Sequence, residues 1–212
     1  MTQSDRPKGI RVSEETPRPR VVAYVGSPRS DGNTSYLVDI ALAELERHGV
    51  RCEKIMIGDF RVLPCQGHDE CEVFSACPLD DDAGPLLEKM YAADGLILAS
   101  PVYYEDVSGQ LKLLIDRNCF NNYHEVWLQA KTIGLIAVGE STGLDETIDS
   151  LRRFVSLSSN SSIKPLAASG FAHRIGDAAG NGPLIASVKQ MAHEMALVLV
   201  DAGAGGRRRQ DA

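Results

Sequence analysis

The stretch that decides the fold reads Val21-Val22-Ala23-Tyr24-Val25, then Gly26-Ser27-Pro28-Arg29-Ser30-Asp31-Gly32-Asn33-Thr34-Ser35, then Tyr36-Leu37. Its first five residues form a continuous apolar run, which is typical of a strand covered on both faces. The ten that follow combine two glycines, four hydroxyl groups, one amide and one cation ahead of an amphipathic run. Backbone N–H groups at a helix start carry the positive end of the helix dipole. The stretch therefore predicts a strand, a turn and a helix that are suited to holding a phosphate.

The composition of this turn narrows the kind of phosphate. It lacks the Lys-Ser/Thr pair of the G-x4-G-K-[ST] loop and the three-glycine spacing of a dinucleotide fingerprint, which disfavours nucleoside triphosphates and NAD-type binding. One cation, several hydroxyl groups and no obvious magnesium ligand favour a single terminal phosphate, as in a mononucleotide cofactor. An ordinary turn capped by Asn33 or Thr34 would explain the same polar residues.

Strands and helices alternate along the rest of the chain. The first helix should run from Leu37 through Leu45 and end at Gly49, a plausible C-cap. Further strands are expected at 52–57, 95–100, 132–138 and 163–171, and further helices at 85–92, 108–117, 144–157 and 183–201. This alternation predicts a doubly wound parallel α/β sheet in one domain, residues 20–201.

Three segments stand outside this alternation. Residues 1–19 and 202–212 are polar or glycine- and arginine-rich and should be flexible, and residues 58–84 form a cysteine-containing insertion. Five cysteines, an odd number with three of them around His68, indicate a metal or redox site rather than a disulfide framework.

The bulk properties exclude some partners. A net charge of −7 and a pI near 5.2 give no general attraction to nucleic acid or to an anionic membrane. No apolar stretch approaches the ~20 residues of a spanning helix, and the first twenty residues show no hydrophobic signal region. We therefore expect a cytoplasmic protein.

Parallel sheets of this kind bind ligands beyond the carboxyl ends of their strands. Three turns qualify: 26–35, 101–104 and 139–143. The first is suited to phosphate, the second carries two adjacent tyrosines, and the third is small and polar. Together they predict a site for a planar ring with a phosphorylated tail, although a lone tyrosine pair is also typical of ordinary packing.

Several motifs follow one another in a characteristic order: Gly26-Ser27-Pro28-Arg29 with Gly32-Asn33-Thr34, a cysteine segment ending in Asp-Asp, Ser100-Pro101-Val102-Tyr103-Tyr104, Ser108-Gly109-Gln110-Leu111-Lys112 and Ile115-Asp116-Arg117. In this order, over roughly residues 21–199, the chain resembles the flavodoxin-like FMN-dependent NAD(P)H oxidoreductases. Within them it is most similar to the iron–sulfur flavoprotein branch. The resemblance implies a flavodoxin-like three-layer sandwich whose five-stranded parallel sheet has the order 2-1-3-4-5.

The resemblance also implies a cofactor site. The FMN phosphate would be held by Ser27, Arg29, Asn33, Thr34 and Ser35. The isoalloxazine ring would be edged by Pro101, Val102, Tyr103 and Tyr104, with Gly139, Glu140 and Ser141 on its far side. No catalytic acid or base is assigned, because the flavin itself carries the hydride or the electrons.

The cysteine segment departs from the family pattern C-x2-C-x2-C-x4-7-C. Here the order is Cys65, His68, Cys71, Cys77, so that histidine takes the second ligand position while the spacing is intact. Three thiolates and an imidazole are compatible with a [4Fe-4S] cluster, and the three thiolates alone with a [3Fe-4S] centre. Cys3His is also a known zinc set, and loss of the metal with retention of the loop is a further alternative.

The function implied is an FMN-dependent oxidoreductase that transfers hydride or electrons between NAD(P)H or an organic donor and a quinone, a nitroaromatic compound or free flavin. Two alternatives are an FMN-dependent dehydrogenase of a small cyclic acid in secondary metabolism and an electron carrier without a substrate of its own. A homodimer or homotetramer is expected, with residues 118–129 at a pocket or subunit contact.

Overall fold

The computed structural model of the protein describes residues 18–159 and 163–207, with residues 202–207 by main chain only. The predicted flexible segment 1–19 lies outside these residues except for Arg18 and Pro19, and so does the end of the predicted tail, 208–212. Five parallel strands form one sheet in the order β2-β1-β3-β4-β5, which confirms the predicted topology. The strands are β1 (Arg20–Val25), β2 (Arg51–Met56), β3 (Gly95–Pro101), β4 (Thr132–Gly139) and β5 (Leu166–Phe171).

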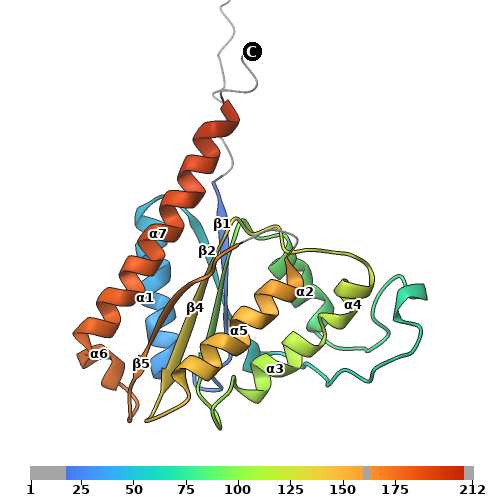
Figure 1. Ribbon diagram of the computed structural model, residues 1–212, viewed down its shortest axis with the longest axis horizontal. Coiled ribbons are helices and arrows are strands. Elements are labelled where there is room, and N and C mark those ends of the chain that lie inside the picture. The colour runs from blue at the N-terminus through green and yellow to red at the C-terminus, as the bar shows by residue number, and fades with distance from the viewer. Residues whose placement is uncertain (1–17, 160–162, 208–212) are drawn as a thin grey trace, which may run out of the picture.

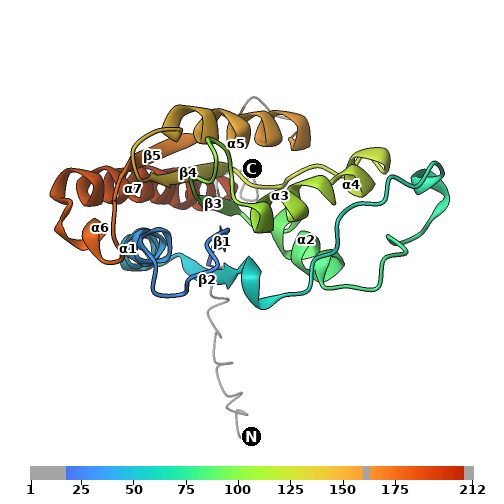
Figure 2. The same cartoon turned by 90° about the horizontal axis from the view of Figure 1, so that it is seen from below.

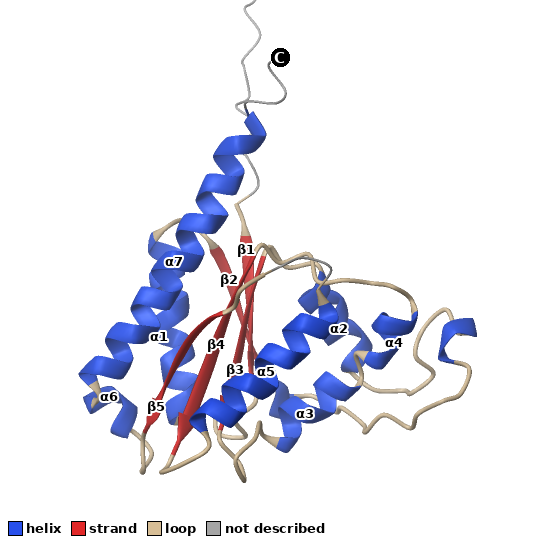
Figure 3. Ribbon diagram, viewed as in Figure 1, coloured by secondary structure: helices blue, strands red, loops and turns tan. Residues whose placement is uncertain are grey.

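Helices cover both faces of the sheet (Figure 1). They are α1 (Asn33–Arg47), α2 (Ala83–Tyr91), α3 (Gly109–Asp116), α4 (Cys119–Tyr123), α5 (Leu144–Ser158), α6 (Asp177–Gly180) and α7 (Gly182–Arg207), with 3-10 turns η1 (Ile57–Asp59) and η2 (Cys71–Val73). Figures 2 and 3 show α1, α6 and α7 on one side of the sheet and α2, α3 and α5 on the other. The fold is therefore a three-layer sandwich of the flavodoxin-like type.

The alternating geometry of a strand explains the apolar run of β1. Val21, Ala23 and Val25 pack with α1 and α7, whereas Val22 and Tyr24 pack in the core on the opposite face. Successive side chains point to opposite faces of a sheet, so that a strand covered on both sides needs apolar residues at every position. All five side chains are completely buried.

Three boundaries differ from the sequence prediction by three residues or more. The first helix was expected from Leu37 but begins at Asn33. The fifth strand was expected from residue 163 but begins at Leu166, directly after Pro165, which has no N–H to give to the strand ladder. The last helix was expected to end at Asp201 but continues to Arg207, so that the predicted solvated tail is helical over 202–207. No proline interrupts this run, and a helix already held by packing propagates easily.

Gly49 helps to end the first helix, but one residue beyond the C-cap position predicted for it. It lies just after the helix C-cap His48 with a φ of +78°, and its N–H donates to the carbonyl of Glu46 at 2.9 Å.

Among the described residues no helix combines the length and the apolar content that crossing a bilayer would require.

Candidate functional site

The turn after β1 is fastened to the neighbouring strand and helix. The N–H of Gly26 donates to the carbonyl of Ala99 at 2.8 Å, and the Ser108 hydroxyl donates to the Gly26 carbonyl at 2.7 Å. A Cβ on Gly26 would lie 2.6 Å from the Ser108 Oγ, so that only glycine permits this approach. The same Ser108 oxygen caps α3 by accepting from the N–H of Leu111. The turn is therefore positioned by contacts far along the chain.

The first turn of α1 presents free backbone donors. The N-cap is Gly32, which makes no side-chain cap, and the N–H groups of Asn33, Thr34 and Ser35 have no hydrogen-bond partner within residues 18–159 and 163–207. The alternative in which Asn33 or Thr34 caps the helix is therefore wrong. Unpaired N–H groups at the positive end of a helix are a favourable place for an anion.

The Asn33 side chain instead bridges to the loop after β5. Its Nδ2 donates to the carbonyl of Arg174 at 2.8 Å, and its Oδ1 accepts from the N–H groups of Gly176 at 3.0 Å and Ala178 at 3.2 Å. Of this residue the backbone N–H and the second hydrogen of Nδ2 remain for a ligand. The contact brings the fifth strand's loop against the turn that precedes α1.

Four strand ends meet around one cavity of about 150 Å³. Among the residues predicted to bind the cofactor, those lining it are Ser27, Arg29, Asn33, Thr34, Pro101, Val102, Tyr103, Gly139 and Glu140. An adjoining hollow of about 480 Å³ shares Val102 and Glu140 and adds the predicted residues Tyr104 and Ser141. Ser35 is completely buried and its hydroxyl donates to the Ser30 carbonyl at 2.6 Å, which leaves its backbone N–H as the group that could face a ligand.

Sequence reasoning missed the fourth wall of this cavity. Ala172, His173, Arg174 and Ile175 line it directly after β5. The available signal was the position of these residues, because the carboxyl ends of parallel strands meet at one edge of a sheet. Arg29 and Arg174 supply two guanidinium groups that form no ion pair in the described parts of the chain, against one carboxylate, Glu140.

The two tyrosines lie on a strained turn between β3 and α3. The N–H of Tyr103 donates to the carbonyl of Asp106 at 2.9 Å, and the N–H of Asp106 donates back at 3.2 Å. Tyr104 and Glu105 have φ values of 53° and 62°, as in a type I′ turn. Non-glycine residues rarely adopt this conformation, which costs about 1–2 kcal/mol each. Tyr103 is 43% exposed at the cavity and Tyr104 projects fully into solvent.

The sequence of this chain matches the model of one protein family, and the cavity described above is consistent with that match. The sequence profile of the NADPH-dependent FMN reductases matches residues 19–173. The chain belongs to this family. FMN is the cofactor that membership in the NADPH-dependent FMN reductase family implies.

Several curated relatives in this family are iron–sulfur flavoproteins. The chain is 40% identical over 137 residues to one from Methanocaldococcus jannaschii, a match that covers 64% of this chain and 70% of that protein. It is 37% identical over 129 residues to one from Archaeoglobus fulgidus, covering 61% of this chain and 58% of the relative. A third, from Methanosarcina thermophila, is 33% identical over 134 residues, covering 62% and 70%.

Solved structures share the fold at low sequence identity. The crystal structure of RosB with bound 8-demethyl-8-formylriboflavin-5'-phosphate superposes with a TM-score of 0.68 at 15% identity, covering 91% of this chain and 87% of that one. The NAD(P)H:quinone oxidoreductase from Methanothermobacter marburgensis gives a TM-score of 0.61 at 16% identity, covering 84% and 98%. At these identities, both structures support the flavodoxin-like fold of this chain.

The residues at the cavity fit FMN. The free N–H groups of α1 with Arg29 and Arg174 suit a phosphate. Gly139 keeps one wall thin, because a Cβ there would lie 3.0 Å from the Thr142 carbonyl and 3.3 Å from Val102. Glycine at this position therefore lets the segments after β3 and β4 approach each other closely beside the cavity.

The cysteine segment projects sideways from the sheet and contacts α4 (Figure 1). Cys71 is buried, Cys65 and Cys77 are partly buried, and His68 packs edge-on against Phe74 with ring centroids 6.1 Å apart. Burial raises the pKa of the Cys71 thiol, and the neighbouring sulfurs of Cys65 and Cys77 raise this pKa further. The three sulfurs are therefore neighbours in space.

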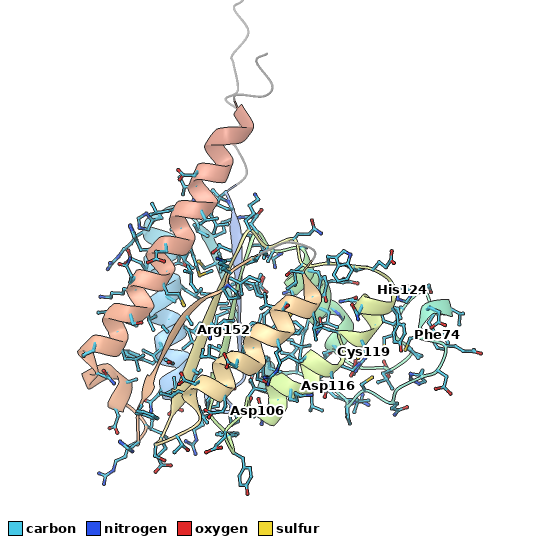
Figure 4. All side chains as sticks on the ribbon, in the orientation of Figure 1. Phe74, Asp106, Asp116, Cys119, His124 and Arg152 are labelled. Carbon is cyan, nitrogen blue, oxygen red and sulfur yellow. The ribbon has the colours of Figure 1, made fainter. Side chains whose placement is uncertain are left out.

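Helix α4 brings Cys119, which the sequence did not place in the ligand set, close to the predicted metal ligands. Figure 4 shows His124 beside Phe74, and the His124 Nε2 lies 3.0 Å from the Phe74 carbonyl oxygen. Burial raises the pKa of Cys119, the first residue of α4, and so do the charges of Cys65, Asp116 and Cys71. Cys119 thus lies near the predicted ligand set, although it is distant in sequence.

The base of this segment is closed by a buried ion pair. The Arg117 Nη1 binds the Asp81 carboxylate and donates to the Leu63 carbonyl at 3.1 Å, while Nη2 donates to the Cys77 sulfur at 3.1 Å. The Asp81 carboxylate also accepts from the N–H of Leu63 at 2.8 Å. The exposed fractions of the two charged side chains are 2% and 0%. Asp81, in the acidic run at the end of the segment, therefore has a structural role.

The spacing of the four predicted ligands distinguishes between possible metals. No three ligand atoms of Cys65, His68, Cys71 and Cys77 lie within 4.8 Å of one another. A single zinc ion bound by thiolates at 2.3 Å would hold the sulfurs about 3.8 Å apart, which is closer than these ligand atoms all lie here. An iron–sulfur cluster spreads its terminal ligands over several irons and so accepts sulfurs that lie farther apart.

Proposed function

We propose that the protein is an FMN-dependent oxidoreductase that passes hydride or electrons from NAD(P)H or an organic donor to a small acceptor such as a quinone. The observation that carries this proposal is the cavity at the strand ends. It combines helix N–H groups and two guanidinium groups that have no partner among residues 18–159 and 163–207 with an open hollow beside the expected ring. A relative from Bacillus subtilis, 30% identical over 98 residues, bears the name putative NAD(P)H-dependent FMN-containing oxidoreductase.

Bound FMN would supply the hydride and electron chemistry. The chain's own groups bind and orient the cofactor: Arg29, Arg174 and the first turn of α1 hold the phosphate, while the segments at Pro101 and Gly139 flank the ring. The adjoining hollow of about 480 Å³ has space for a small second reactant next to the ring.

The decisive experiment is anaerobic reduction of the FMN-loaded protein in a stopped-flow instrument with NADPH, NADH and organic donors. Bleaching of the flavin bands by a nicotinamide, followed by reoxidation with a quinone, supports the reductase. Bleaching by an organic donor alone points to the dehydrogenase alternative, in which a small cyclic acid is oxidised. A protein that binds no FMN contradicts the proposal as a whole.

Replacing Arg29 with alanine should weaken FMN binding by about 1.5–3 kcal/mol, roughly 10- to 150-fold, because a charge-assisted hydrogen bond to the phosphate is lost. Fluorescence titration of the apoprotein with FMN measures the change. Arg152→Ala is the matched control, because Arg152 is an exposed arginine on α5 that pairs with Asp149 (Figure 4). An unchanged affinity in Arg29→Ala would place the phosphate elsewhere.

We further propose that the cysteine segment holds an iron–sulfur cluster. The iron–sulfur flavoproteins among the relatives and the gathered thiols of Cys65, Cys71 and Cys77 support this. Protein isolated without oxygen should contain iron and labile sulfide, and Cys71→Ser should lose both while retaining FMN. Flavin without iron in the wild-type protein would exclude the cluster. A cluster-containing protein that reduces no small acceptor would favour the electron carrier.

A further inference from the structure

Helices α1 and α7 lie side by side on one face of the sheet (Figure 1). Glu44 and His48 project from the last turns of α1, and His193 approaches them from α7. One ligand atom from each of these three residues lies within 4.8 Å of the other two. Residues four apart share one face of a helix, which explains how Glu44 and His48 meet the same neighbour.

Two of the three distances between these atoms are close to those around one metal ion, and the third is below 4.8 Å. The His193 Nδ1 lies 3.2 Å from the His48 Nε2, and the same His48 nitrogen lies 3.5 Å from the Glu44 Oε1. Two ligand atoms bound tetrahedrally at 2.0–2.1 Å from Zn²⁺ are about 3.3–3.4 Å apart. The two imidazole rings are tilted by 59° rather than stacked, so that their nitrogens meet edge to edge.

Hydrogen bonds alone cannot pair all the polar atoms of Glu44, His48 and His193 well. If the His48 Nε2 carries the proton, one hydrogen has to serve both the His193 nitrogen and the Glu44 carboxylate. If His193 donates, the His48 lone pair faces the carboxylate. A divalent cation between the three atoms would use all their lone pairs at once.

The neighbouring side chains orient the carboxylate. The Arg47 Nη1 binds the Glu44 Oε2 at 3.1 Å, which leaves Oε1 to face His48. The exposed fraction of the Glu44 side chain is 17% and that of His48 is 31%, so the group is partly withdrawn from water yet reachable by an ion. Such contacts to the outer oxygen of a ligating carboxylate are common at metal sites.

We propose that Glu44, His48 and His193 form a binding site for a borderline divalent transition metal, with Zn²⁺ as the expected ion and solvent at its fourth position. Two imidazoles and one carboxylate are a ligand set that this ion prefers. The site lies at the end of α1 remote from Asn33, about 20 Å along the helix from the flavin cavity. The bound ion would link α1 to α7 and stabilise the folded chain.

Cobalt(II) is the probe that separates this site from the cysteine segment. Co²⁺ added to the wild-type protein should give visible bands without the intense near-ultraviolet absorption of thiolate ligation, and Zn²⁺ should displace it. His193→Gln should weaken Co²⁺ binding at this site by roughly 100-fold or more, because a direct ligand costs more than the 10- to 100-fold of an outer contact. The matched control is Glu194→Gln, the next residue of α7, which should bind as the wild type does.

A second variant keeps the test decisive if His193→Gln fails to fold. Glu44→Gln should also lose the Co²⁺ bands, whereas Glu46→Gln, an exposed neighbour on α1, should keep them. Absence of Co²⁺ binding in the wild type, thiolate-type absorption only, or equal binding by Glu44→Gln and Glu46→Gln would overturn the proposal.

Discussion

Replacing Arg117 with methionine is expected to lower the free energy of unfolding by about 3–5 kcal/mol. The substitution removes one partner of a buried ion pair and leaves the Asp81 carboxylate, whose exposed fraction is 0%, without its counter-charge. It also removes the donors to the Leu63 carbonyl and the Cys77 sulfur. Urea unfolding followed by circular dichroism measures the loss.

Lys112→Met is the control, because Lys112 forms an exposed ion pair with Asp116 on the same helix. Exposed pairs contribute about 0–1 kcal/mol, so the two variants should differ clearly. The double variant Arg117→Met with Asp81→Asn should recover part of the loss, since no buried charge is left unpaired. If Arg117→Met is no less stable than Lys112→Met, the ion pair does not hold the segment.

The same pair has a pH signature. Burial alone would raise the pKa of Asp81, but the hydrogen bonds from Arg117, Leu63 and Ala83 outweigh it and hold this pKa below its usual value. A lowered carboxyl pKa contributes stability above the unfolded pKa of about 4, and this contribution is lost as the pH falls through the folded value. The wild type should therefore lose stability in acid more steeply than Arg117→Met does.

Gly143→Ala is expected to cost about 2–5 kcal/mol of folding free energy. Gly143 has a φ of +78°, where a side chain costs about 1–2 kcal/mol. Its Cβ would also lie 2.7 Å from the Glu105 Cα and from Val102, and such overpacking adds about 1–3 kcal/mol. Because Val102 lines both hollows and Glu105 lines the larger one, FMN affinity should fall as well.

Gly49→Ala isolates the conformational cost, so its difference from Gly143→Ala gives the cost of overpacking. Gly49 has the same φ of +78° but no atom within 4 Å of the added Cβ, so this variant carries only the conformational cost. Thermal unfolding of both variants, with FMN titration alongside, measures the difference. Equal destabilisation would show that the contact with Glu105 is relieved at no cost.

The parallel α/β sheet could be predicted because its signals are local, whereas its order 2-1-3-4-5 was implied only by the resemblance to a family. The apolar run of β1 faces two cores and can only be a central strand. The β5 edge was harder to predict, because Leu166 to Phe171 is rich in small residues and lies partly exposed. Its start is set by Pro165 and its ladder with β4, which the local pattern does not reveal.

The site was predictable at three of its four walls. The turns after β1, β3 and β4 carry glycines, hydroxyl groups or tyrosines, which are typical of ligand-binding turns. The structure brings these three turns together around one cavity. His173 and Arg174 follow a weak strand and carry no motif, so only the topology reveals them. The nearness of Cys119 to Cys71 likewise depends on how α4 packs, a contact between residues far apart in sequence.

The Asn33 amide changes how substitutions in the β1–α1 turn should be interpreted. In the sequence this residue resembles a phosphate ligand, yet its side chain fixes the distance between the turn and the 174–178 loop. An alanine scan that found weaker FMN binding at Asn33 would be measuring displacement of Arg174. The cofactor meets a turn and a loop that are already in place, so little of its binding free energy is consumed in ordering them. Among homologues, residue 33 should therefore covary with the loop after the last strand rather than with the identity of the cofactor.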